Sequence, residues 1–270
     1  MDRKWGGLFW SILLIVAGVV FLLDSLEIIT VNAWGLVSAT ALILVGLWLL
    51  LGGITARDDV EQADISIPLD SASRATVRFH HGAGQLQVNA GTVGGDLITG
   101  SFGGGLDERV RRVGGEVEAD LRVPKNLSSR LLVPGLWRWG RTLDWTVGLS
   151  PEIPLALEFE TGAGKTELDL TKLLVSDLRV QTGASSTQIT LPENAGLTQV
   201  KIGAGAAEIG IRVPETVAAS IRIAGALSDI QVDEDRFPRM SGGYQSADYE
   251  TAPNRTEITI EMGVGSVRIR

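Results

Sequence analysis

The sequence predicts an N-terminal hairpin of two transmembrane helices followed by an all-β domain. The expected domain is a parallel β-solenoid, a β-helix-like coil with rungs of about 20 residues. Three observations predict this architecture: two long uncharged apolar runs near the N-terminus, a Gly-x-Gly motif that recurs at nearly constant spacing, and alternating apolar residues on both sides of each motif.

The two N-terminal apolar runs are long enough to cross a bilayer. Residues 5–23 carry no charged side chain, and neither do residues 28–56. Each run therefore meets the requirement of about 20 apolar residues for a membrane-spanning helix. We expect a hairpin over residues 1–57, with helices at about 5–23 and 31–54.

Basic residues flank only the outer ends of this hairpin. Arg3 and Lys4 precede the first run and Arg57 follows the second, whereas the connector holds Asp24 and Glu27. The positive-inside rule then places both termini in the cytoplasm. A cleaved signal peptide is the alternative for the first run, but no small-residue cleavage site follows it and the second run comes almost at once. The predicted location is the cell membrane, with a multi-pass anchor and a cytoplasmic soluble domain.

Charge and residue content exclude several classes of function. The chain carries 24 basic and 32 acidic residues, a net charge of −8, and no cysteine. An acidic domain is poorly suited to nucleic acid, so no nucleic-acid partner is expected. The two histidines, His80 and His81, are adjacent and should point to opposite faces of a strand, as a solvent-satisfied pair at a turn edge. We therefore predict no zinc site, no histidine-based triad and no cofactor.

A short unit built around a glycine-rich corner repeats along the rest of the chain. The copies are GAGQLQV (82–88), GAGKTEL (162–168), GASSTQI (183–189), GAGAAEI (203–209), AGALSDI (224–230) and GVGSVRI (263–269). The starts at 162, 183, 203 and 224 lie 20 or 21 residues apart. Glycine tolerates positive φ and close backbone approach, so each motif should turn a tight corner between two strands. Proline follows several units, in VPKN, LPEN and VPET, where a strand must stop.

The residues around each corner alternate between apolar and polar. The predicted inward positions are Val77, Phe79, Leu86, Val88, Leu157, Phe159, Leu168, Leu170, Leu178, Val180, Ile189, Leu191, Val200, Ile202, Ile209, Ile211, Ile221, Ile223, Ile230, Val232, Ile258, Ile260, Val267 and Ile269. One such unit cannot bury its own apolar face, whereas stacked units bury all of them together. An antiparallel sandwich of hairpins is the structural alternative, but a coil explains why the same corner recurs at one spacing.

The domain boundaries follow from where the repeat is present. Residues 58–74 are expected to form a linker or a first strand, and residues 75–270 the repeat domain. The repeat is interrupted around 101–150 and 234–257, and these insertions are expected to cap or decorate the coil.

Aromatic and cationic residues gather in the first insertion. This combination is enriched in binding hot spots, so we predict a partner interface there. The predicted interface residues are Trp137, Arg138, Trp139, Arg141 and Trp145. The alternative is that these side chains plug one end of the coil.

Two patterns invite an enzymatic interpretation. GAGKT at 162–166 ends like a phosphate-binding loop, but the required earlier glycine is absent and an alternating strand follows instead of a helix. Glu158, Glu160, Glu167 and Asp169 form acidic rows like those that hydrolyse sugars, yet outward strand positions are charged for solubility as well. We therefore predict no catalytic residues and no enzyme.

The chain resembles a known family in three places. Residues 5–53 look like the LiaI/LiaF-type transmembrane region, with GLFWSILLIVAGVVFLLDSL before a Trp-rich second span. Residues 143–191, with IPLALE, TGAG and LDLT in that order, are similar to the toast-rack domain of LiaF-like cell-wall-active antibiotic response proteins. The closing ITIEMGVGSVRI looks like the last rung of that domain.

This resemblance implies a membrane-anchored regulatory or scaffolding protein of bacterial cell-envelope stress signalling that acts by protein contact. The implied partners are the lipid bilayer and a protein such as a two-component sensor kinase. The family brings no catalytic residues. The alternative is a polymerising, bactofilin-like, membrane-tethered scaffold, so homo-oligomers are left open.

Overall fold

The computed structural model describes residues 62–92, 95–124 and 143–270 of the chain. The expected transmembrane helices at 5–23 and 31–54 lie outside these residues. Across the described ranges, no helix is both long enough and apolar enough to cross a membrane.

The described part is all-β, which confirms the predicted class of the domain. Its strands are β1 (Gln62–Pro68), β2 (Arg74–Ala90), β3 (Asp96–Gly103), β4 (Asp107–Val113), β5 (Glu116–Arg122), β6 (Trp145–Leu149), β7 (Pro154–Asp169), β8 (Leu174–Thr190), β9 (Leu197–Arg212), β10 (Ala218–Val232), β11 (Arg239–Met240), β12 (Gly243–Gln245) and β13 (Arg255–Ile269). β5, β8 and β9 each end two residues before a proline, as the sequence predicts.

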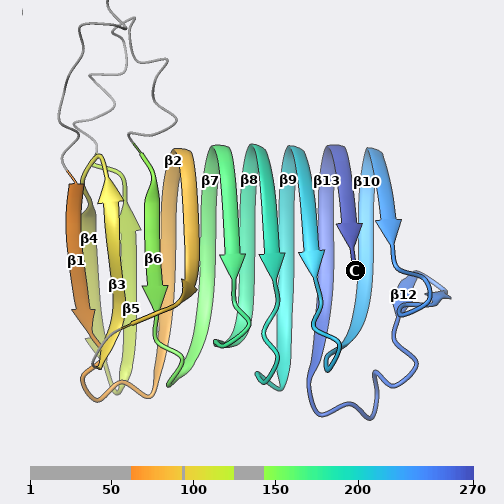
Figure 1. The fold of residues 1–270 in the computed structure, drawn as a ribbon, viewed down its shortest axis with the longest axis horizontal. Helices are drawn as coiled ribbons and strands as arrows, with labels where there is room; N and C mark the ends of the chain where they lie inside the picture. The colour runs from red at the N-terminus through yellow and green to blue at the C-terminus, as the bar shows by residue number, and fades with distance from the viewer. Residues whose placement is uncertain (1–61, 93–94, 125–142) are drawn as a thin grey trace, which may run out of the picture. The chain divides into compact units, whose positions relative to one another are not determined.

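Six long strands form the coil. β2, β7, β8, β9, β13 and β10 each run up one face, turn a corner near their middle and descend the opposite face (Figure 1). Each pairs with the next in parallel and nearly continuous register. This confirms the parallel coil and shows that the antiparallel sandwich is wrong for these strands.

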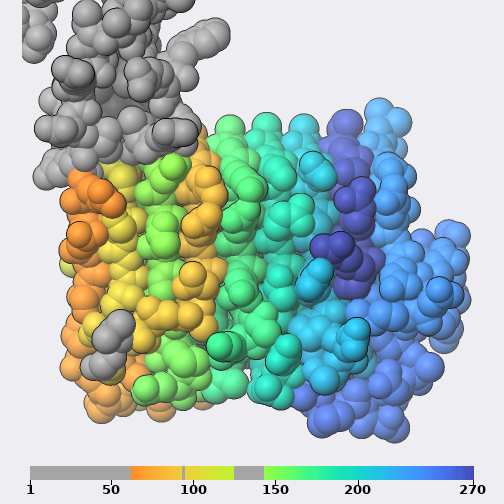
Figure 2. Space-filling view, viewed as in Figure 1, coloured from red at the N-terminus to blue at the C-terminus, as the bar shows by residue number. Residues whose placement is uncertain are grey.

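The order of the rungs differs from their order along the chain. β13, the last strand of the sequence, lies between β9 and β10 and pairs with both. Figure 2 shows this as a dark blue band between the cyan of β9 and the lighter blue of β10. The inward side chains of β13 include Ile258, Ile260 and Val267, all at most 1% exposed. An interior position in the stack therefore suits β13 better than an edge.

In β9 and β10, the corner lies two residues further along the chain than the glycine motif predicts. The backbone register stacks Gly162, Gly183 and Gly205, so the corner of β9 starts at Gly205 rather than at residue 203. The corner of β10 starts at Ala226 rather than at residue 224. Because a two-residue shift leaves the period of two intact, the predicted inward positions are unaffected.

Close stacking of backbones explains why glycine recurs at the corners. A Cβ atom added to Gly183 would lie 2.6 Å from the carbonyl oxygen of Gly162 on the neighbouring rung. A Cβ on Gly164 would overlap the carbonyl oxygen of Gly84, and Gly164 also has φ of +140°. Both reasons that the sequence suggested, positive φ and close approach, therefore apply.

The core fills the space between the two faces of the coil. Phe79 and Phe159 stack with ring centroids 4.8 Å apart and are both 0% exposed. The predicted inward residues are buried on every rung except the last. On β10, Ile223 and Val232 are only partly buried and Ile230 is 38% exposed.

Shorter strands extend the two faces beyond the coil. β6, β3 and β1 continue one face next to the second half of β2, while β5 and β4 continue the other next to its first half. At the other end, β12 and β11 extend only the face formed by the first half of β10. The two ends of the stack are therefore built differently.

Candidate functional site

The predicted interface residues do not form one described surface. Trp145 lies on β6 with 0% of its surface exposed, and its Nε1 donates a hydrogen bond to the carbonyl oxygen of Gly103 at 3.2 Å. Its ring packs edge-on against Phe102 at 5.1 Å between centroids. Trp145 is thus a core residue, and the prediction that it contacts a partner is wrong. The other predicted residues lie outside the described part of the chain: Trp137, Arg138, Trp139 and Arg141.

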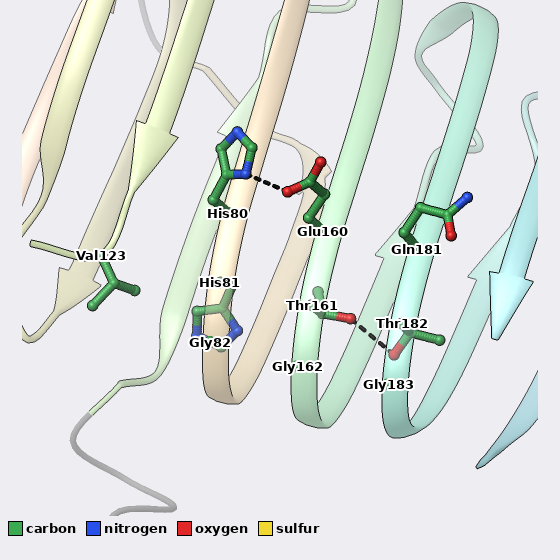
Figure 3. Close-up of a pocket in the computed structure, with 10 residues that line it drawn as sticks. All are labelled: His80, His81, Gly82, Val123, Glu160, Thr161, Gly162, Gln181, Thr182 and Gly183. Carbon is green, nitrogen blue, oxygen red and sulfur yellow. Dashed lines mark hydrogen bonds and ion pairs between the residues drawn. The ribbon is translucent and has the colours of Figure 1, made fainter. Parts of the chain in front are cut away.

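A shallow groove lies beside the corners of three neighbouring rungs. It occupies about 570 Å³ over β2, β7 and β8 and reaches Val123 at the end of β5. Its polar lining includes His80, Glu160, Gln181 and Thr182. We call it the His80 groove (Figure 3).

Close contacts between side chains of neighbouring strands organise the His80 groove. His80 Nδ1 lies 2.7 Å from a carboxylate oxygen of Glu160, and its Nε2 lies 3.4 Å from a carboxylate oxygen of Asp120. Arg122 donates two hydrogen bonds to Asp120, which lower the pKa of that carboxyl group. The imidazole is therefore held between carboxylates on the strands to either side of its own.

Hydroxyl groups continue this network at the corner. Thr161 Oγ1 donates to Thr182 Oγ1 at 3.0 Å, and Thr182 Oγ1 donates to Ser185 Oγ at 2.7 Å. Figure 3 shows the Thr161–Thr182 pair just before the glycines of two neighbouring rungs. The floor of the groove thus offers hydroxyl and amide groups at the spacing of adjacent strands, which is suited to hydrogen bonding with a polar surface.

The acidic rows that suggested sugar chemistry are divided between two opposite outer faces. Glu158 precedes the corner of β7 and pairs with Arg78 at 3.2 Å. Glu167 follows the corner, forms an ion pair with Lys165 and accepts a hydrogen bond from Gln87 at 3.1 Å. The bond from Lys165 lowers the pKa of Glu167. The acidic residues therefore do not form one row facing one substrate.

The phosphate-loop interpretation of GAGKT fails in the structure as well. Residues 162–166 lie within β7, which runs from Pro154 to Asp169 as one bent strand. A phosphate-binding loop needs a helix after it. Over the described ranges, no three histidine or acidic side chains are grouped so as to hold a metal ion.

His81 is buried, which differs from the predicted solvent-satisfied pair. Only 3% of its surface is exposed, because it continues the inward phase of Val77 and Phe79 on β2. Its Nε2 lies 2.7 Å from the carbonyl oxygen of Leu143, so Nε2 carries the proton and donates. Burial lowers the pKa of His81 from its ordinary value.

We expect the free energy of unfolding to fall as the pH drops from about 7 to 5. The unfolded chain takes up a proton at His81 near pH 6.5 that the folded chain does not, so stability is complete above pH 6.5 and is lost below it. The contribution of one such group has a slope of at most about 1.4 kcal/mol per pH unit. Urea unfolding of the full-length chain in detergent, followed by circular dichroism at several pH values, measures it.

The matched control is His81→Gln, which retains a donor for Leu143 but cannot titrate. It should be less stable than the parent throughout, with a flatter dependence between pH 7 and 5. Equal slopes for the two chains would mean that His81 is not the titrating group.

The sequence contains a signal for the His80 groove. His80, Glu160 and Gln181 each stand two residues before the first glycine of a corner. Aligning the corners places these side chains side by side on one outer face, although His80 and Glu160 are separated by 80 residues.

A family model and two solved structures match this chain. The model of the N-terminal domain of toast_rack, DUF2154, matches residues 56–212. The solved structure of a candidate cell adhesion protein from Clostridium sporogenes ATCC 15579 aligns with a TM-score of 0.70 and 18% identity, covering 78% of this chain and 99% of that one. The solved structure of a candidate adhesin from Bacteroides fragilis NCTC 9343 aligns with a TM-score of 0.29 and 9% identity, over 79% of this chain and 98% of that one. No curated protein sequence matches.

Proposed function

Because the chain belongs to the family defined by the N-terminal domain of toast_rack, we propose that it is a membrane-anchored protein that regulates or scaffolds through protein contact. The process is bacterial cell-envelope stress signalling, and the partner is a membrane protein such as a sensor kinase. The anchor is the pair of apolar runs at 5–23 and 31–54.

One observation carries the proposal: the long strands stack in register, so their outer faces present side chains at fixed positions. Adjacent strands lie about 4.8 Å apart, and the repeated corners keep every rung in the same orientation. Extended surfaces of this kind are what stacked-repeat proteins use for binding. The structural relative of similar fold is described as a candidate for cell adhesion, which is also a function of contact.

The chemistry of the outer faces supports contact rather than catalysis. The carboxylates of Glu158, Glu160 and Glu167 are each paired with a cation or an imidazole on the surface. Such paired groups are held in place and remain accessible at the rim of a binding surface, where charges steer association and select partners. The His80 groove lies on one of these outer faces.

A partner should therefore cross-link to the face that carries the groove. We would place a photoreactive amino acid at Gln181 in the full-length chain, expressed in its native membranes. The expected result is a discrete cross-linked band containing a second membrane protein. The control carries the same group at Gln188, an exposed residue on the opposite outer face of the same strand, and should yield far less of that band.

A link to envelope stress adds a second measurement. The band from Gln181 should change in intensity when cells receive a cell-wall-active antibiotic. The double variant Trp137→Ala/Trp139→Ala tests whether the Trp-rich segment contributes, since loss of the band assigns it to the same interface. Equal bands from Gln181 and Gln188, or none from either, would contradict a contact role for this face.

A further inference from the structure

The stack ends on β10, and this end is only half covered. The first half of β10 pairs with β12 at Ser220 and Ile221. Phe237, in the segment between β10 and β11, is 0% exposed. The second half, Leu227–Val232, pairs with β13 on one side, and among the described ranges no strand pairs with its other side. Its outward N–H and C=O groups form an open sheet edge.

Exposed apolar side chains concentrate at the same end. Six large apolar side chains are exposed in the described ranges, and four of them lie on β10, β11 and β13: Leu227 (73%), Met240 (58%), Val264 (51%) and Ile230 (38%). On the neighbouring rung, the inward residue at the register of Ile230 is Val267, which is 1% exposed. The inner layer of the coil is therefore open to solvent at this edge, as if one more strand were needed to close it.

The usual protections of an edge strand are missing here. Natural edges carry lysine, proline or a bulge that prevents pairing. Residues 226–232 read ALSDIQV, with Asp229 as the only charge. At the other end of the coil the edge strand β4 carries several arginines, and Arg112 donates to Asp70 and to the carbonyl oxygen of Pro68. These hydrogen bonds connect β4 on one face with the end of β1 on the other.

We propose that this edge binds a second copy of the chain, with the two β10 strands antiparallel about a two-fold axis at Ile230. The inference does not depend on the signalling role proposed above. This contact joins the inner layers of the two coils and buries Ile230 from both copies. A two-fold contact uses the same patch twice, so one open edge is sufficient.

The charges around Ile230 select this register. With the axis at Ile230, Asp229 of each copy lies opposite Gln231 of the other, and Gln231 already accepts a hydrogen bond from Arg268. Moving the axis to Asp229 would oppose two carboxylates, and moving it to Gln231 would oppose Asp229 and Asp233. Like charges directly opposite destabilise an antiparallel pair. An axis placed between two residues would instead pair the inward Ile230 with an outward side chain, Asp229 or Gln231.

A second copy fits better than continued polymerisation. Filaments need two different edges that complement each other at opposite ends of the coil. The described strands provide an apolar edge at β10, whose only charge is Asp229. At the other end the edge strands are β1, with Asp64, and β4, which carries three arginines and exposes Val113 as its only large apolar side chain. Association through β10 therefore stops at a dimer.

Cysteine cross-linking of the full-length chain tests the register. The chain has no cysteine, so a single Ile230→Cys change reports only this contact. In membranes treated with a short bifunctional thiol reagent, covalent dimers should exceed those of the control Gln188→Cys by about tenfold, because only residues near the axis come opposite their own copy. Equal yields from the two positions would overturn the proposal.

Mass measurement in detergent separates this contact from association through the hairpin. The parent should have the mass of two chains, and Ile230→Lys should weaken the dimer by about tenfold or more because it places two like charges opposite each other at the axis. Val113→Lys changes an exposed valine at the other end and should leave the dimer intact. A monomeric parent, assemblies larger than two, or equal effects of the two lysines would each contradict the proposal. Failure here leaves the cross-linking test at Gln181 unaffected.

Discussion

Gly164→Ala is expected to lower the free energy of unfolding by about 2–5 kcal/mol, combining backbone strain with overpacking. Gly164 has φ of +140°, a conformation that alanine adopts only at a cost. Its added Cβ would also overlap the carbonyl oxygen of Gly84 on the neighbouring rung, and that oxygen cannot move without disturbing the corner. The strands must separate or the corner must deform.

The control for this prediction is Gly82, which lies two residues before Gly84, the residue of β2 that pairs with Gly164. Gly82 has no atom within 4 Å of the position where its Cβ would lie. Gly82→Ala should therefore change stability by no more than about 1 kcal/mol. Urea unfolding of both variants, in the full-length chain in detergent, gives the comparison. Similar losses for the two variants would show that close stacking at Gly164 is not what requires glycine.

Trp145→Ala should be the most destabilising change on β6, with an expected loss of about 3–5 kcal/mol. The side chain is 0% exposed, and its removal leaves a large cavity between Phe102 and His81. It also leaves the carbonyl oxygen of Gly103 without the hydrogen bond from Nε1. A buried acceptor that loses its donor adds to the cost of the cavity.

Thr146→Ala provides the comparison, because Thr146 is the exposed neighbour on the same strand. It should change the unfolding free energy by less than about 0.5 kcal/mol. Denaturation of both variants in detergent measures the difference. If Trp145→Ala instead left stability intact and removed a cross-linked partner, the original prediction of an interface residue would be right and its assignment to the core wrong.

The alternation of the strands was predictable because it depends only on local sequence. Val77 and Phe79, or Val200 and Ile202, face inward whatever the register between rungs, since a shift of two residues preserves the pattern. The same reasoning, carried one step further, would have placed His81 and Trp145 in the core. His81 continues the phase of Phe79, and Trp145 continues that of Val147.

The register of β9 could not be read from its motif. The letters GAG at 203–205 suggest a corner at residue 203, but Gly203 is still in the straight part of the strand, where the side chain of Gln181 covers it. The corner position is set by hydrogen bonds to β8, which are long-range in sequence. In the same way, a local pattern carries no information about which rungs become neighbours, so the sequence does not predict the place of β13 between β9 and β10.

The position of β13 also affects how the domain is made. A chain leaving the ribosome exposes β9 and β10 before β13 exists, and the two strands that finally flank β13 are then free to pair with each other in a non-native arrangement. The stack reaches its final order only when residues 255–269 have been released. A premature stop codon before residue 255 would thus remove an internal layer of the domain and leave β9 and β10 without the strand that both pair with.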